Sequence, residues 1–412
     1  MWFSPWRRVL RGRSGDAKPS GLRAGTKFVE EDTGVEYTYD PVMKEWKKRT
    51  APYSAIVCKD GSTVWAEDAS GKTIASGESG VDDASVIQSA LDVGGTVFIK
   101  SGEYTGDSIT LNNNVLIGEG CRHQDPSSTI LKMDVKVTKT HTSIYNLLIE
   151  DHGLYAGGEI SDIFLENIHI VDAPGDAFHL RDVYGAKLLN CKAWNAMGRG
   201  FNIEGCHGIT LFNCIADHCN VGCRLTESPL STGCSLYGAA IINCLFRMNK
   251  QYGLFAEGVR NLHITNGTRF DENSQEGEGL YDEIYLDEDS NNNPCRNFEI
   301  KAHIMSSNAR HLINCNAAEH GVIECPHLSG GKTTGIRLTG AANNIEIRNP
   351  KLDYIQASTK IYNEGNNFIQ FVGKFNSPPL TVKGVLYLDD GTNTADGKPH
   401  WRYYDGTAWH DL

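Results

Sequence analysis

The chain has 412 residues, 40% of them hydrophobic, and its 39 basic and 51 acidic side chains give a formal charge of −12. This acidic balance argues against nucleic acid as the main partner, because nucleic acids bind basic surfaces. No apolar run approaches the ~18–20 residues that cross a bilayer, so we expect no transmembrane span.

Residues 1–24 form a tail in which Trp2, Phe3 and Trp6 alternate with arginines. The tail lacks the apolar centre of a signal peptide, so secretory export through a leader is not expected. Two interpretations stay open: a helix lying in a membrane interface, or an arm that orders on a partner protein.

Residues 25–77 are expected to form a β-hairpin module, because short β-prone runs alternate with Asp-Gly and Ser-Gly turns. A capping helix follows over 82–92, begun by Asp82 or Asp83. Its apolar residues Val86, Ile87, Ala90 and Leu91 share one face.

The central part of the chain repeats a short pattern of two apolar residues followed by Asn. The Asn of this pattern is found at Asn146, Asn167, Asn190, Asn213, Asn243, Asn266 and Asn349. In two further units Ala302 and Cys325 take the place of the Asn. A period near 23 residues with two-residue apolar alternation predicts stacked β units, which bury their apolar sides only against their neighbours. We expect the Asn side chains to form an inward, buried ladder, with Cys191, Cys214 and Cys244 as a stack of small apolar plugs.

These observations predict an all-β fold: a right-handed, single-stranded parallel β-helix over residues 78–372, with the capping helix at its start. Aromatic-rich hairpins at 373–412 predict a C-terminal β-hairpin module. The twelve cysteines show no spacing typical of disulfides or zinc.

The run from Gly94 to Thr105, which follows the expected helix, resembles the opening of β-helix domains of the pectate lyase (pectin-lyase-like) superfamily. The terminal modules, above all Gly384 to Leu412, resemble hairpin segments of tail-spike and tail-fibre proteins of tailed viruses. This resemblance implies a trimeric protein on the surface of a virion that meets host glycans, sometimes as a depolymerase. The catalytic motifs of lyases and polygalacturonases are not found, so no catalytic residue is carried over.

The second strand of each unit is expected to present two columns of outward side chains that could bind a saccharide. The binding candidates are His179, Arg181, Asn202, Arg224, Phe255, Tyr285 and Arg337. The insertions 227–238 and 288–297 leave directly after this strand and are expected to wall the groove. The alternative is a solvated face with ion pairs such as Arg181 with Glu204.

Three carboxylates of the second column are candidates for catalysis: Glu257, Asp287 and Glu204. Glu257 and Asp287 fall on consecutive coils, so their strands should lie ~4.8 Å apart. Repulsion between the two carboxylates would raise the pKa of one of them. That carboxyl could then serve as the acid and the other as the base in glycoside cleavage. Acidic residues between Glu276 and Asp289 could hold Ca²⁺, although a solvated loop is the simpler reading, and no cofactor is expected.

A homotrimer is expected to pack along an outward apolar face formed by Val171, Trp194, Ile215, Leu245 and Phe270. The favoured function is a non-catalytic virion or extracellular surface protein, like a tail spike or fibre. It would bind host glycans or polysaccharides along the rod and other tail proteins through residues 1–77. The alternative is a polysaccharide lyase or glycoside hydrolase.

Overall fold

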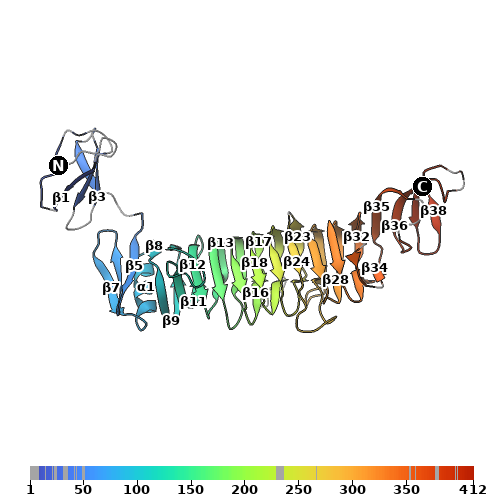
Figure 1. The fold of residues 1–412 in the computed structure, drawn as a ribbon, viewed down its shortest axis with the longest axis horizontal. Helices are drawn as coiled ribbons and strands as arrows, with labels where there is room; N and C mark the ends of the chain where they lie inside the picture. The colour runs from blue at the N-terminus through green and yellow to red at the C-terminus, as the bar shows by residue number, and fades with distance from the viewer. Residues whose placement is uncertain are drawn as a thin grey trace.

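The computed structural model describes residues 9–13, 15–20, 22, 26–30, 36–40, 42, 44–48, 52–228, 236–265, 267–351, 354–357, 359–375, 380–394, 396 and 398–412. Most of them form a long parallel β-helix, with β-hairpins at both ends (Figure 1). The predicted all-β fold is confirmed. No helix among the described residues is both long and apolar enough to cross a lipid bilayer.

The N-terminal strands fall into two sheets. The first sheet contains β1 (Val9–Gly12), β2 (Lys27–Glu30), β3 (Glu36–Asp40) and β4 (Glu45–Lys48). The second is a meander of β5 (Ala55–Asp60), β6 (Thr63–Asp68) and β7 (Thr73–Glu78), and β5 pairs in parallel with the first strand of the solenoid. The range 25–77 is therefore divided between two sheets, and residues 9–12 of the expected tail form a strand.

The one helix among the described residues, α1 (Asp83–Asp92), covers the first coil as predicted, and its side chains Val86, Ile87, Ala90 and Leu91 are buried. Asp83 is itself buried, where its carboxylate accepts from the backbone N–H of Thr105 and pairs with Lys59 at 2.8 Å. The helix hides the open end of the solenoid, whose unpaired strand edges would otherwise attract other chains.

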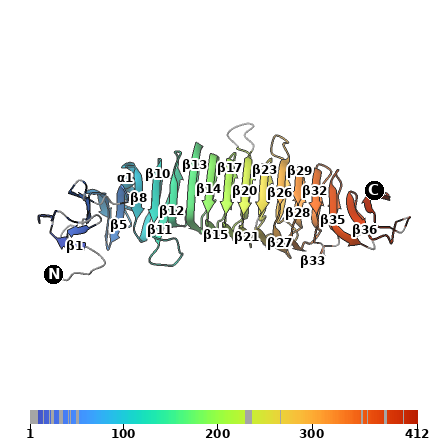
Figure 2. The same ribbon diagram turned by 90° about the horizontal axis from the view of Figure 1, so that it is seen from above.

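Behind the cap, each coil contributes up to three strands, and each strand pairs in parallel with its counterpart one coil away (Figure 2). The first row, which precedes the Asn corner, contains β8 (Gly95–Ile99), β10 (Asn114–Gly118), β12 (Ser143–Glu150), β13 (Leu154–Val171), β17 (His207–Phe212), β20 (Tyr237–Ile242), β23 (Arg260–Thr265), β26 (Cys295–Ile300), β29 (Ala318–Ile323), β32 (Asn343–Arg348) and β35 (Phe368–Phe375). The second row, after the corner, contains β15 (Lys192–Trp194), β18 (Ile215–Asp217), β21 (Leu245–Arg247), β24 (Arg269–Asp271), β27 (His303–Ser306), β30 (His327–Gly330) and β33 (Tyr354–Ile355). The third row contains β9 (Gly102–Leu111), β11 (Thr129–Val137), β14 (Phe178–Leu189), β16 (Arg199–Glu204), β19 (Val221–Thr226), β22 (Leu254–Glu257), β25 (Ile284–Asp287), β28 (His311–Cys315), β31 (Thr334–Leu338) and β34 (Thr359–Asn363). The long strands β13 and β14 run on from one row to the next.

Two-residue alternation places every second side chain inside the coil, where it meets the equivalent residue of the next coil. Leu188 pairs with Leu211, which pairs with Ile241, and all three are buried. The predicted cysteine plugs are confirmed, because Cys191, Cys214 and Cys244 are fully buried free thiols.

The Asn ladder exists, but its predicted burial is wrong. Asn167 donates to Asn146 at 2.9 Å, Asn213 to Asn190 at 2.7 Å and Asn243 to Asn213 at 3.3 Å. All five have φ between 53° and 55°. This left-handed conformation, which Asn tolerates well, bends the chain at a corner and leaves the amides on the outside, half-buried or exposed. Asn266 lies outside the described residues.

A second, truly buried polar column lies in the C-terminal half. The amide of Asn249 donates to Asn273 at 2.7 Å, and the amide of Asn273 donates to the carboxylate of Glu283. All three residues are fully buried. Their remaining groups bind the backbone, as when Asn249 accepts from the N–H of Cys219 at 2.9 Å. The column therefore provides hydrogen-bond partners for buried backbone N–H and C=O groups of successive coils.

The predicted apolar trimer face is wrong. In the pairing register Trp194 aligns with Asp217, whereas Ile215 aligns with Lys192, so the five residues do not form one column. Phe270 points inward and stacks on Phe246 at 5.1 Å, because the preceding turn contains one extra residue. The homotrimer stays a prediction, which light scattering tests against the monomer mass of 45.3 kDa.

At the C-terminal end β35 passes its pairing to β36 (Val385–Asp389), and β37 (Trp401–Tyr404) and β38 (Trp409–Asp411) follow as antiparallel hairpins. Tyr387 is buried there and donates its hydroxyl to the buried Asp389 at 2.8 Å. The hairpins therefore extend the main sheet.

Candidate functional site

The two outward columns of the third strand row pair largely as the sequence predicts. His179 aligns with Asn202, Asn202 with Arg224, and Phe255 with Tyr285. One coil was missed, because Asn314 lies between Tyr285 and Arg337. The column also begins two coils earlier, at Lys136 and Tyr155. The alternation Val135-Lys136-Val137 and Leu154-Tyr155-Ala156 is the signal that would have identified these two coils.

The first half of this face is an ion-paired network around Glu204. Its Oε2 accepts from His179 Nε2 at 2.9 Å and from Arg181 Nε at 2.8 Å, so the predicted ion pair with Arg181 is confirmed. Arg224 lies 3.7 Å from the other carboxylate oxygen. Burial alone would raise the pKa of Glu204, but the hydrogen bonds and charges of His179 and Arg181 outweigh it and lower the pKa to about 2.

Asn202 lies in the middle of this network and is only 1% exposed. Its amide nitrogen donates to Asp176 at 2.8 Å and to Glu204 at 3.2 Å. Its carbonyl oxygen Oδ1 is buried and has no partner among the described residues. An unpaired buried acceptor costs about 1–3 kcal/mol, so this oxygen needs a donor from outside the chain.

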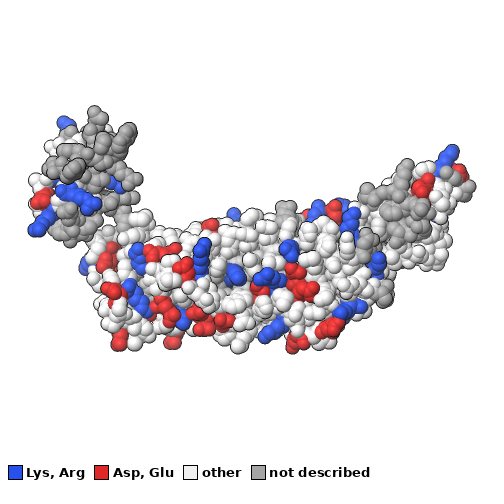
Figure 3. Space-filling view, in the orientation of Figure 1, with Lys and Arg blue, Asp and Glu red and all other residues white. Residues whose placement is uncertain are grey.

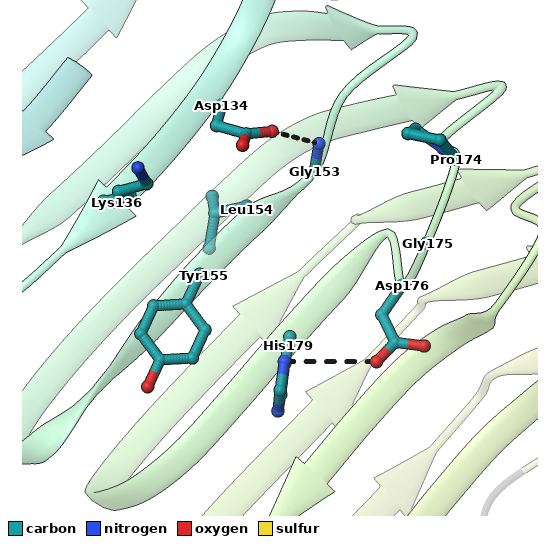
Figure 4. Close-up of a pocket in the computed structure, with 9 residues that line it drawn as sticks. All are labelled: Asp134, Lys136, Gly153, Leu154, Tyr155, Pro174, Gly175, Asp176 and His179. Carbon is teal, nitrogen blue, oxygen red and sulfur yellow. Dashed lines mark hydrogen bonds and ion pairs between the residues drawn. The ribbon is translucent and has the colours of Figure 1, made fainter. Parts of the chain in front are cut away.

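A pocket of about 280 Å³ adjoins the network (Figure 4). Tyr155 and His179 form one side of it, and their rings meet at 81° with centroids 5.2 Å apart. Two carboxylates, Asp134 and Asp176, also line the pocket, and Lys136 adds a cation. Asp134 accepts from the N–H of Gly153 at 3.4 Å, and Asp176 lies 4.0 Å from His179. Apart from His179, none of these polar and aromatic residues was predicted from the sequence.

In the second half of the face the aromatic rings cover one another. Phe255 and Tyr285 stack with centroids 5.4 Å apart, and Tyr252 contacts both rings at 5.0 and 5.7 Å. The Tyr285 hydroxyl donates to Asp287 at 2.7 Å. Burial, followed by this hydrogen bond, raises the pKa of Tyr285. The ring faces predicted to receive sugars are thus largely occupied by neighbouring rings.

The predicted catalytic carboxylates Glu257 and Asp287 are adjacent in register, as expected. Each already has partners of its own. Glu257 pairs with Arg224 at 3.1 Å, and Asp287 accepts from Asn316 at 2.9 Å. Glu204 is unsuited to the proton-donor role, because a carboxyl with a pKa of about 2 holds no proton at neutral pH. The pair stays a prediction that mutation must test.

The two insertions meet beside this face. Glu227 accepts from the amide of Asn291 at 2.7 Å and from the hydroxyl of Ser290. The loop that follows β25 projects from one edge of the solenoid (Figure 2). Residues 229–235 of the first insertion lie outside the described residues.

The acidic residues considered for Ca²⁺ do not converge. Asp282 is buried in a two-point ion pair with Arg310, at 3.0 and 2.8 Å, while Glu283 turns inward. In the part of the chain that the structure describes, no group of three or more His, Cys, Asp or Glu is placed to hold a metal ion. Acidic and basic side chains are interspersed along the view of the rod in Figure 3.

Comparison with known proteins agrees on the fold. Residues 103–268 match the sequence model of the right-handed β-helix region. A search of curated protein sequences finds no significant match. Similar solved structures include the A-module of the Azotobacter vinelandii mannuronan C-5 epimerase AlgE6, at 14% identity over 71% of this chain and 95% of that chain, with a TM-score of 0.42. They also include the Family 28 exopolygalacturonase of Yersinia enterocolitica, at 10% identity over 74% and 82%, with a TM-score of 0.39. A third is the tailspike gp49 of the Acinetobacter baumannii bacteriophage Fri1, a capsular polysaccharide depolymerase, at 14% identity over 88% and 70%, with a TM-score of 0.36.

At these identities and TM-scores the solved structures carry no argument about activity. The class is defined by the chain itself: a right-handed parallel β-helix, closed by a helix at one end and continued by hairpins at the other. Its most complete candidate site is the pocket between β11 and β14, together with the Glu204 network beside it.

Proposed function

We propose that this protein is a rod on a virion or cell surface, similar to a tail spike, that binds a saccharide at the pocket lined by Tyr155 and His179. The pocket is the observation that carries the proposal. It combines an aromatic wall with carboxylates and a lysine, the groups that contact the C–H faces and hydroxyls of a sugar.

The stiffness of the site fits recognition by a preformed surface. Asp176 is held by the amide of Asn202 and by the N–H of Arg199, both at 2.8 Å. Arg181 and His179 are fixed through one carboxylate oxygen of Glu204. A site ordered before binding loses little conformational entropy when the ligand arrives.

A glycan panel tests this function. The full chain is expected to bind at least one surface polysaccharide, and Tyr155→Ala is expected to weaken that binding about fivefold to tenfold, since ring contacts contribute roughly 1–1.5 kcal/mol. Tyr285→Ala is the matched control and should change the affinity less than threefold. Equal losses in both variants would contradict the assignment of the pocket.

Cleavage of the bound polysaccharide, by a lyase or a hydrolase, is the second candidate. One observation favours it: Asp134 and Asp176 line the same pocket as a tyrosine and a histidine, all groups able to transfer protons. Incubation with acidic polysaccharides should then release reducing ends or unsaturated ends that absorb ultraviolet light. His179→Ala should abolish the release. If Glu257→Gln and Asp287→Asn abolish it and His179→Ala does not, the chemistry belongs to the predicted carboxylate pair.

A further inference from the structure

The Asn ladder is interrupted in two coils near the C-terminal end of the solenoid. There the ladder place is taken by Ala302 and Cys325, whose side chains are buried at 0% and 3% exposure. Neither residue has the left-handed φ of the ladder asparagines. The ladder position returns at Asn349, with a φ of 43°. In these two coils no asparagine side chain lies along the outer corner, where Pro326 is exposed instead.

A pocket of about 420 Å³ occupies this interruption. It is lined by residues of four successive coils, from Gly267 to Lys351. Its floor is the buried Cys325, and its rims carry Lys301, His303 and Lys351. The pocket is on a different row of strands from the Tyr155 pocket and shares no residue with it.

Three polar groups at this pocket lack partners in the described part of the chain. In the ladder the amides of Asn167, Asn213 and Asn243 each donate to the Asn of the preceding coil. For Asn349 the preceding position is the inward-turned Cys325, and its side chain makes no hydrogen bond. Lys351 is exposed and forms no ion pair, and His303 contacts only the ring of His327, at 6.3 Å.

The remaining charges are already matched. Lys301 pairs with Glu299 at 2.9 Å and with Glu324 at 3.5 Å. The groups still available at the pocket are the Asn349 amide, the His303 imidazole and the Lys351 ammonium, and the Glu324 carboxylate that also lines the pocket is held by Lys301. The ammonium is the one cation without an ion pair among these lining residues, so an anionic ligand with acceptor oxygens fits it, and the amide can add a second donor.

We propose that this pocket is a second saccharide site, which takes an anionic group carried on a sugar, namely a carboxylate or a sulfate. The anion accepts from Asn349 Nδ2 and Lys351 Nζ, while the ring of the sugar lies over the corner that the ladder leaves open. The site does not depend on the proposed function of the Tyr155 pocket, because the two share no residue.

Titration of the full chain with three oligosaccharides of equal length, one carboxylated, one sulfated and one neutral, tests the proposal. We expect the carboxylated or the sulfated ligand to bind, and which of the two binds identifies the anion. Lys351→Glu should weaken that binding at least tenfold at low salt, and raising the salt should weaken binding to the unchanged chain. Asn349→Ala should weaken it about threefold to tenfold.

Lys187→Glu, at an exposed lysine on β14, is the matched control and should leave the affinity unchanged. Both lysines are exposed, so neither change should alter the melting temperature. The same titrations made with the Tyr155→Ala chain reduce the contribution of the first pocket, and the effect of Lys351→Glu should persist there. Equal binding of the neutral ligand, equal loss in the Lys187 variant, or no binding of any anionic ligand would overturn the proposal.

Discussion

The two halves of the solenoid place their polar groups in different locations. Up to β19 the polar side chains lie on the outer face, where Glu204 organises His179 and Arg181 beside an open pocket. From β21 onward a polar column lies inside the coil, where Asn249, Asn273 and Glu283 are fully buried. The outer aromatic rings of that second half cover one another.

This difference separates binding from stability. Side chains that point outward and keep unpaired groups are available to a ligand, whereas a buried network acts through the backbone that it holds in place. The Tyr155 pocket of the first half is therefore available to a ligand, whereas the polar column of the second half is structural. Each prediction below compares a change in one half with its counterpart in the other.

The largest loss of folding stability is expected from Asn249→Asp. It replaces an amide nitrogen, which donates to Asn273 at 2.7 Å and to the carbonyl of Ala216 at 3.3 Å, by an oxygen that repels both acceptors. A buried unpaired charge costs several kcal/mol. Asn190→Asp in the outer ladder keeps the oxygen that accepts from Asn213 and should cost less than about 1 kcal/mol. Urea unfolding of both variants measures the difference, and similar losses would show that the two columns are equally buried.

The second-largest expected effect is a pH-dependent change in folding stability caused by Glu283. Burial raises its pKa from 4.5 to about 7, despite hydrogen bonds from Asn273 and Ser306. Because the folded pKa lies above the unfolded one, the stability from this group is complete below pH 4.5 and is lost as the pH rises through 7. The free energy of unfolding of the unchanged chain should fall by on the order of 2 kcal/mol over that range, relative to Glu283→Gln. Parallel pH profiles for the two proteins would contradict a raised pKa.

Glu204 is expected to make the folding stability depend on pH in the opposite direction and by a smaller amount. Its pKa falls from 4.5 to about 2 in the folded chain. The stability from its ion pairs is therefore complete above pH 4.5 and is lost as the pH falls toward 2. Denaturant titrations between pH 6 and 3 should show a loss of about 1–2 kcal/mol in the unchanged chain and a flatter profile in Glu204→Gln.

The sequence predicts the parts of the fold that depend on strict alternation. The coil rows, the buried face of α1 and the cysteine plugs all follow from period-two or helical spacing. The ladder bonds were also predicted, but the predicted burial of the ladder was wrong, because one left-handed residue turns the side chain from inside to outside without changing the sequence pattern. Phe270 was misplaced for a related reason: turns of unequal length shift the register by one residue, which reverses the face.

The site was predicted only in part. Columns of residues on successive coils could be aligned from the repeat, and they indicated His179, Arg181 and Glu204. The pocket could not be predicted, because it depends on Tyr155 and Asp134 from irregular early coils and on which rings cover each other. Stacking of Phe255 on Tyr285 is a matter of side-chain rotation, which spacing does not specify.

The central claim is that the saccharide binds in the first half of the solenoid. A crystal structure of the full chain with the best ligand of the glycan panel tests it most directly. We predict a sugar ring against Tyr155 and His179, with a hydroxyl within hydrogen-bond distance of Asp134 or Asp176. A sugar seated only on β22 and β25, beside Phe255 and Tyr285, would contradict the account.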